Sequence, residues 1–93
     1  MSCLHIVNRL ISHEHCQTIL DTMTSGDSIV LIEDGCYLPA QNLKQPLSNE
    51  IYILKTDAMV RGMELPSNVT ILQNYNDFVD LTAKFDKSIT WNF

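Results

Sequence analysis

The sequence has few basic residues and no cluster of them. Only six lysines and arginines occur among 93 residues, against eleven aspartates and glutamates, which gives a formal net charge of −5. Proteins that grip nucleic-acid phosphates carry a basic patch, and that patch is missing here. We therefore expect no direct contact with nucleic acid and expect a partner protein to handle any that is involved.

Long hydrophobic runs are also missing. No apolar run approaches the roughly 20 residues that a helix needs to cross a bilayer. The first residues lack the basic segment and the long apolar segment of a signal peptide. We expect a cytoplasmic protein with no membrane partner.

Cysteines are few, and their spacing matches neither a zinc ribbon nor a redox dithiol. Cys3, Cys16 and Cys36 form an odd set, so we expect free thiols instead of a disulfide framework. Within the run from His13 to Cys16, only these two end residues would share a helix face. Zinc needs three or four ligands, so no metal site is predicted.

A glycine-rich phosphate fingerprint is absent as well. Asp34-Gly35 follows an apolar run, but neither further glycines nor a phosphate-loop lysine come after it. The sequence therefore predicts a turn at Asp34-Gly35 and no bound cofactor.

The most informative segment that is present is the apolar run Ser28–Ile32, which ends in Glu33-Asp34-Gly35. An unbroken run of this length indicates a strand buried on both faces, as in a parallel sheet covered by helices. Four further segments have strand composition. The five predicted strands are Leu4–Val7, Ser28–Ile32, Glu50–Leu54, Val69–Leu72 and Ser88–Trp91.

Helical segments alternate with these strands. Ser12 is a suitable N-cap for a first helix, with an apolar stripe that runs from Cys16 to Met23, and Gly26 is expected to end that helix. Asn74, with Asp77 three residues later, is expected to cap the last helix. Two short helices are predicted between them, one from Pro39 to Pro46 and one capped by Thr56-Asp57 that extends through Arg61.

This alternation predicts an α/β fold with three layers, α/β/α, and a five-stranded, mainly parallel sheet. The length fits a single domain over residues 1–93. The chain is 45% hydrophobic but only 18% charged, which leaves little polar surface for a small monomer. We expect an oligomer.

Function is expected at the carboxyl ends of the strands, where a parallel sheet meets its ligands and partners. The candidate rim or interface residues are Asn8, Arg9, Asp34, Gly35 and Arg61. Arg61 is suited to an anion or to a partner's carboxylate. His5 alternates with apolar neighbours and is expected to be a hydrogen-bonded interior side chain unless a carboxylate lies beside it.

The order of several short motifs resembles the TusB/DsrH family of sulfur-relay proteins. The motifs are Leu4–Arg9, Gly26-Asp27 before Leu31–Gly35, Val60-Arg61-Gly62, Tyr75–Leu81 and a late Trp91. The resemblance spans nearly the whole chain and implies a five-stranded parallel sheet between helices.

The resemblance further implies a subunit of a hetero-oligomer with TusC/DsrF-like and TusD/DsrE-like subunits, which passes persulfide sulfur between carriers. In the TusB branch the sulfur ends in 2-thiouridine at the tRNA wobble position, and in the DsrH branch the setting is intracellular sulfur oxidation. Of these we expect the tRNA branch and an accessory role. A homodimer is the alternative to this hetero-oligomer when the chain is isolated from its partners.

Two cysteines are the candidates for a sulfur-carrying role. Cys36 follows a predicted strand at the expected rim, although the family usually has an apolar residue there. Relatives of the DsrH type carry a relay cysteine in the first helix, near Ile19 or Leu20 here, and Cys16 lies about one turn earlier. The alternatives to an accessory role are a persulfide carrier that uses Cys36 or Cys16, and a flavodoxin-like module that binds an anion or nucleotide.

Overall fold

The computed structural model describes residues 2–37, 50–65 and 69–91. Along the chain, strands alternate with helical elements. The strands are β1 (Cys3–Val7), β2 (Ser28–Leu31), β3 (Ile51–Leu54), β4 (Thr70–Leu72) and β5 (Lys87–Trp91). The helical elements are α1 (His13–Thr22), the 3₁₀ helix η1 (Glu33–Tyr37), α2 (Lys55–Val60) and α3 (Tyr75–Thr82).

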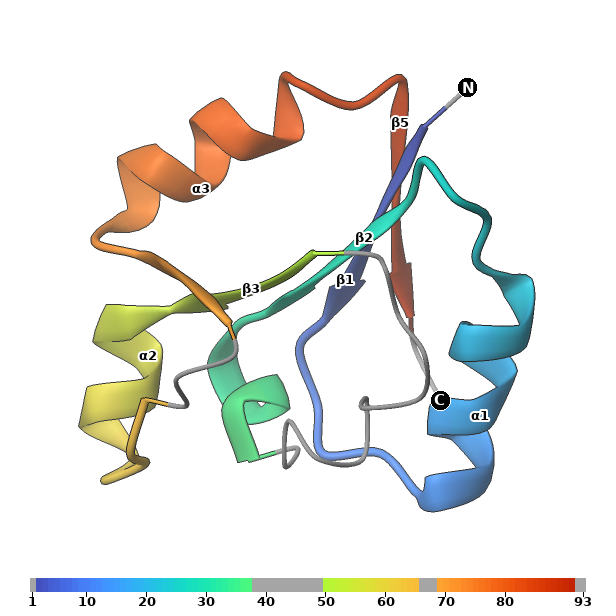
Figure 1. Ribbon diagram of the computed structural model, residues 1–93. Helices are drawn as coiled ribbons and strands as arrows, with labels where there is room; N and C mark the ends of the chain where they lie inside the picture. The colour runs from blue at the N-terminus through green and yellow to red at the C-terminus, as the bar shows by residue number, and fades with distance from the viewer. Residues whose placement is uncertain (1, 38–49, 66–68, 92–93) are drawn as a thin grey trace.

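The five strands form one fully parallel sheet in the order β4-β3-β2-β1-β5. Figure 1 shows α3 on one face of the sheet and α1 and α2 on the other. The predicted α/β/α architecture with a five-stranded parallel sheet is confirmed. None of the helices in the described part of the chain is long and apolar enough to cross a membrane.

Two hydrophobic clusters hold the layers together, one on each face of the sheet. Cys16 and Ile19 of α1 pack with Val7 and Ile29 on one face. Phe78 and Leu81 of α3 pack with other sheet residues on the opposite face. Because side chains alternate along a strand, β1 and β2 contribute to both clusters and are buried along their whole length.

The edge strand β5 differs from the strands in the centre of the sheet. Four of its five residues are exposed, and only Trp91 is partly buried. An edge strand has a neighbour on one side only, and the lysine at its start is typical of edges that do not pair with other chains.

The predicted caps are confirmed at two helices. The Ser12 hydroxyl accepts a hydrogen bond from the His15 N–H at the start of α1. At the start of α3, the Asn74 side chain accepts one from the Asp77 N–H. Both caps are local, since donor and acceptor lie three residues apart.

Two predicted helix boundaries are wrong. The first helix ends at Thr22, four residues before Gly26, because Asp27 accepts hydrogen bonds from the N–H and the hydroxyl of Thr24 and so holds that segment in a turn. Helix α2 starts at Lys55, directly after β3, and no side chain caps it. The predicted helix from Pro39 to Pro46 lies outside the described residues.

We predict that Gly35→Ala lowers the free energy of unfolding by at least about 2 kcal/mol. A Cβ at this position would lie 2.0 Å from the Val7 carbonyl oxygen, so the backbone of β1 or η1 would have to move. Urea unfolding measures the loss. Gly62→Ala is the control: its φ of +69° strains alanine, but nothing lies within 4 Å, so we expect a smaller loss of about 1 kcal/mol. Equal losses would contradict the steric argument.

Candidate functional site

The predicted rim residues lie at the carboxyl ends of β1 and β2 and at the end of α2. Arg61 Nε donates to Asp34 Oδ1 at 2.9 Å, which joins α2 to η1. Gly35 lies against the backbone of Val7 and Asn8. Arg9 is exposed after β1. The structure thus brings together two pairs of predicted residues, Asp34 with Arg61 and Asn8 with Gly35.

Asp57 is a rim residue whose role the sequence did not indicate. Its carboxylate accepts from the Glu33 N–H at 2.7 Å, and its backbone carbonyl accepts from the Arg61 guanidinium at 3.1 Å. Glu33 needs this support because its φ of +49° is unusual for a residue with a Cβ. The partner lies 24 residues away in sequence, so no local pattern could have revealed the contact.

Cys36 follows β2 at this rim, but its side chain is buried. Its thiol donates to the Leu31 carbonyl oxygen at 3.7 Å. Burial raises the pKa of the thiol to about 11, helped by Asp57 and Asp34 and opposed by Arg61. The Cys36 thiol is therefore protonated at pH 7, whereas the thiolate is the form that attacks a persulfide.

Cys16 and Cys3 are buried as well. Cys16 is 1% exposed in the cluster beneath α1, and burial raises the pKa of its thiol. Cys3 is 4% exposed, and burial together with the Asp27 charge raises the pKa of its thiol, although Lys87 opposes this. None of the three thiols therefore has the accessible, low-pKa character of a reactive cysteine.

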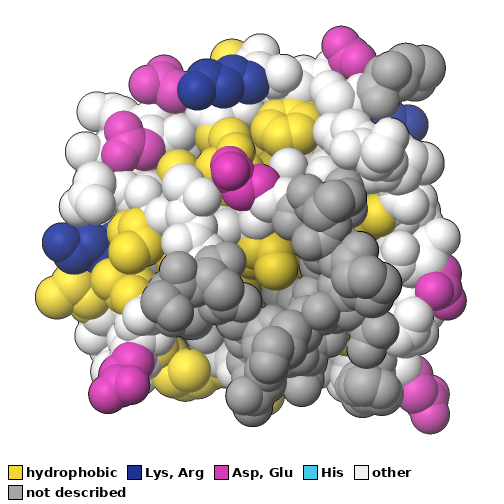
Figure 2. Space-filling view, viewed as in Figure 1, with side chains coloured by type: hydrophobic (Ala, Val, Ile, Leu, Met, Phe, Trp, Pro, Cys, Tyr) yellow, Lys and Arg dark blue, Asp and Glu magenta, His cyan; other side chains and the backbone are white. Residues whose placement is uncertain are grey.

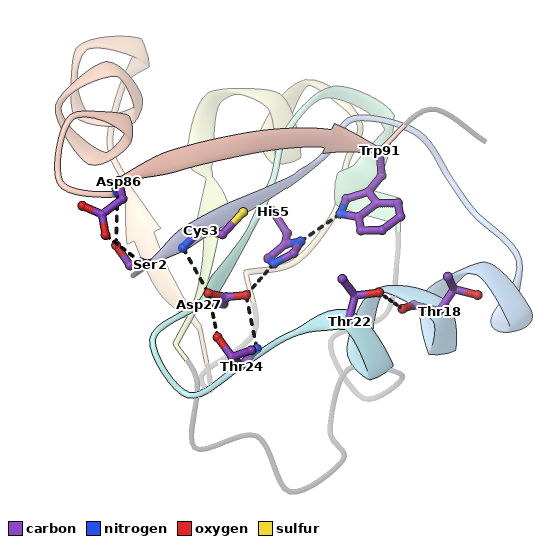
Figure 3. Close-up of polar contacts among 9 residues, drawn as sticks. All are labelled: Ser2, Cys3, His5, Thr18, Thr22, Thr24, Asp27, Asp86 and Trp91. Carbon is purple, nitrogen blue, oxygen red and sulfur yellow. Dashed lines mark hydrogen bonds and ion pairs between the residues drawn. The ribbon is translucent and has the colours of Figure 1, made fainter.

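A second polar cluster lies on the α1 side of the sheet (Figure 3). His5, in the middle of β1, hydrogen-bonds through Nε2 to Asp27 Oδ2 at 2.9 Å. Trp91, at the end of β5, donates from its indole nitrogen to His5 Nδ1 at 2.9 Å, and the two ring planes are nearly parallel, with an angle of 18° between them and centroids 5.9 Å apart. A carboxylate therefore does lie beside His5, which was the exception named for a purely structural histidine, so the hydrogen bonds of both ring nitrogens must be considered.

The donor-only indole fixes the tautomer of His5. Because Trp91 donates to Nδ1, Nδ1 carries no proton, and Nε2 must carry the proton that it donates to Asp27. Both ring nitrogens are thus occupied within the protein. This arrangement suits a structural histidine, since a general base needs a free nitrogen that faces its substrate.

Asp27 is the centre of this cluster. Its Oδ1 accepts from the Cys3 N–H at 3.0 Å and from the Thr24 hydroxyl at 3.2 Å, and its Oδ2 accepts from the Thr24 N–H at 3.2 Å as well as from His5. Burial alone would raise the pKa of the carboxyl, but the hydrogen bonds from His5, Thr24 and Cys3 outweigh burial and lower it. Asp27 is therefore an ionised buried carboxylate.

A cavity of about 230 Å³ lies beside this cluster, and its lining includes Cys3, His5, Asp27 and Lys87. It is large enough for several water molecules. Among the residues that the structure describes, no three histidine, cysteine or acidic side chains are grouped so that they could hold a metal ion.

We predict that Asp27→Asn lowers the free energy of unfolding at pH 7 by about 3 kcal/mol. An amide would place an NH₂ group against donors that now face a carboxylate oxygen. Urea unfolding at several pH values measures the effect. The exposed Asp80→Asn is the control, with a change within about 0.5 kcal/mol.

The pH dependence has a defined sign. The folded-state pKa of Asp27 is lowered, so its contribution is complete above the unfolded-state pKa of about 3.9 and is lost as pH falls through the folded-state value. The gap between wild type and Asp27→Asn should therefore shrink in acid. A gap that stays constant down to pH 2 would contradict the assignment of Asp27 as ionised.

Comparisons with known proteins agree with this fold. A family model described as DsrH like protein matches residues 11–88. Protein TusB of Pectobacterium carotovorum is 33% identical, in an alignment that covers 95% of this chain and 99% of the relative. Protein TusB of Yersinia pseudotuberculosis is 32% identical over 87% of this chain and 96% of its own.

A solved structure is similar over nearly the whole chain. The solution NMR structure of a Thermotoga maritima protein matches with a TM-score of 0.64 and 25% identity, over 90% of this chain and 93% of that one. The family model and the TusB relatives add sequence similarity over most of the chain to this similarity of fold. The chain belongs to the TusB/DsrH family of sulfur-relay subunits.

Proposed function

We propose that this chain, acting as a single domain over residues 1–93, is an accessory subunit of a cytoplasmic sulfur-relay complex. Its partners are TusC/DsrF-like and TusD/DsrE-like subunits, and the complex thiolates the wobble uridine of tRNA. The TusB names of the relatives support the tRNA branch over sulfur oxidation. The formal net charge of −5 supports tRNA contact through another chain.

The burial of all three thiols is the observation that supports the accessory role. All three thiols are less than 5% exposed, and the pKa of each is raised. A persulfide carrier needs an accessible thiolate, so the sulfur is expected to stay on the cysteine of a partner subunit.

Assembly is the first test. When the chain is mixed with the TusC-like and TusD-like subunits, we expect native mass spectrometry to show one species that contains all three chains. Pairwise mixtures are the controls and identify which subunit it binds directly. A chain that stays separate in every mixture would contradict the proposed role.

Activity of cysteine variants is the second test. We expect Cys16→Ala and Cys36→Ala complexes to form 2-thiouridine at a rate within about twofold of wild type, because neither thiol touches the sulfur. Alanine suits these apolar sites, since it adds no buried hydroxyl. Assembly of each variant is checked in parallel. A variant that assembles normally but loses most of its activity would place sulfur on that thiol.

A further inference from the structure

Helix α2 presents two neighbouring apolar side chains to solvent. Met59 is 61% exposed and Val60 is 77% exposed, the highest value among the large hydrophobic side chains of the described residues. Tyr37, at the end of the adjacent η1, is 39% exposed. Hydrophobic side chains gather over α2 at the left of Figure 2. We refer to Tyr37, Met59 and Val60, together with the acidic residues of η1, α2 and the segment 61–65, as the α2–η1 surface.

The helix that carries this surface is firmly held on its other side. Ala58 is fully buried in the core, and Arg61 and Asp57 tie α2 to η1 through the contacts with Asp34 and Glu33. Met59 and Val60 are therefore exposed because they lie on the outer side of an anchored helix. Because the helix is already anchored, little backbone entropy is lost when a partner covers these side chains.

The elements that carry these side chains are mainly acidic. In the described residues of η1, of α2 and of the segment 61–65 there are four carboxylates and two cations, and because Asp34 and Arg61 pair with each other, three carboxylates remain against Lys55. Arg61 is already paired with Asp34, and the Lys55 ammonium lies 3.4 Å from the Gln73 side chain. The four acidic residues are Glu33, Asp34, Asp57 and Glu64.

This charge distribution argues against a second copy of the same surface. A two-fold dimer would bring these carboxylates close to their own copies, and each chain carries a net charge of −5. An apolar centre with an acidic surround is complementary to an apolar centre with a basic surround.

We propose that the α2–η1 surface docks a sister relay subunit whose contact surface carries apolar side chains ringed by lysine and arginine. The inference rests on the proposed function, because it assigns the surface through which this chain enters the complex. Met59 and Val60 supply the apolar contact, and the carboxylates accelerate and orient the encounter.

Lysine substitutions test the apolar part of the surface. In the reconstituted complex we expect Met59→Lys and Val60→Lys each to raise the dissociation constant at least about tenfold, because each removes apolar contact and repels a basic partner. Lysine is compatible with the last turn of a helix, so folding should be unchanged. The neutral variant Val60→Gln should weaken binding by a smaller factor, and urea unfolding of each isolated variant checks folding.

Val79→Lys is the matched control. Val79 is a 47% exposed valine on α3, on the other face of the sheet, and its substitution should leave the dissociation constant within about twofold of wild type. Equal losses for Val60→Lys and Val79→Lys would overturn the assignment of the surface.

Carboxylate substitutions test the electrostatic part. Glu33→Gln and Glu64→Gln should slow association at low salt and reduce its salt dependence, whereas Asp80→Asn on α3 should do neither. If wild type assembles but the α2 and acidic variants assemble equally well, the surface is overturned and the accessory role stands. If wild type does not assemble at all, both the accessory role and the docking surface are contradicted.

Discussion

The buried carboxylate of Asp27 is the interaction on which the centre of the fold depends. It lies just before β2, accepts from the Cys3 N–H at the start of β1, and reaches β5 through His5 and Trp91. An ionised group that is buried must keep all its donors, since the loss of one leaves part of the charge unpaired. The carboxylate therefore fixes how β1 packs between β2 and β5, in the register that pairs His5 with Ile29 and with Ile89.

That register decides what lies at the carboxyl ends of the strands. With β1 and β2 aligned, the carbonyl of Val7 comes so close to the 3₁₀ helix that only glycine fits at position 35. The chain then turns inward, and Cys36 lies under the helical layer instead of at the surface. The same packing that stabilises the sheet removes this thiol from solvent and raises its pKa. A chain built in this way is suited to support sulfur transfer by its neighbours.

Local patterns predicted the elements well. The run Ser28–Ile32 and the Asn74 cap involve residues that are adjacent or three apart, so composition and spacing reveal them. The apolar stripe from Cys16 to Met23, also visible in the sequence, does face the core, where Cys16 and Ile19 are buried. The alternation of strands and helices predicted a mainly parallel sheet, and every strand pair is in fact parallel.

Contacts between distant residues could not be predicted. Trp91 and His5 are 86 residues apart, and Asp27 is 22 residues from His5, so no window of sequence contains the cluster. The end of the first helix was misplaced for a different, local reason: the turn after it is set by Asp27, which accepts hydrogen bonds from Thr24 three residues earlier, and not by Gly26. At the rim, Asp57 was expected to cap its own helix but instead supports Glu33 of a neighbouring element.

In the proposed accessory role, sulfur passes through the complex without residing on this chain. The most direct measurement is the intact mass of each subunit after the assembled complex has reacted with a persulfide donor. We expect a partner subunit to gain a sulfur atom while the mass of this chain is unchanged. A sulfur adduct on this chain that disappears in Cys36→Ala or Cys16→Ala would contradict it.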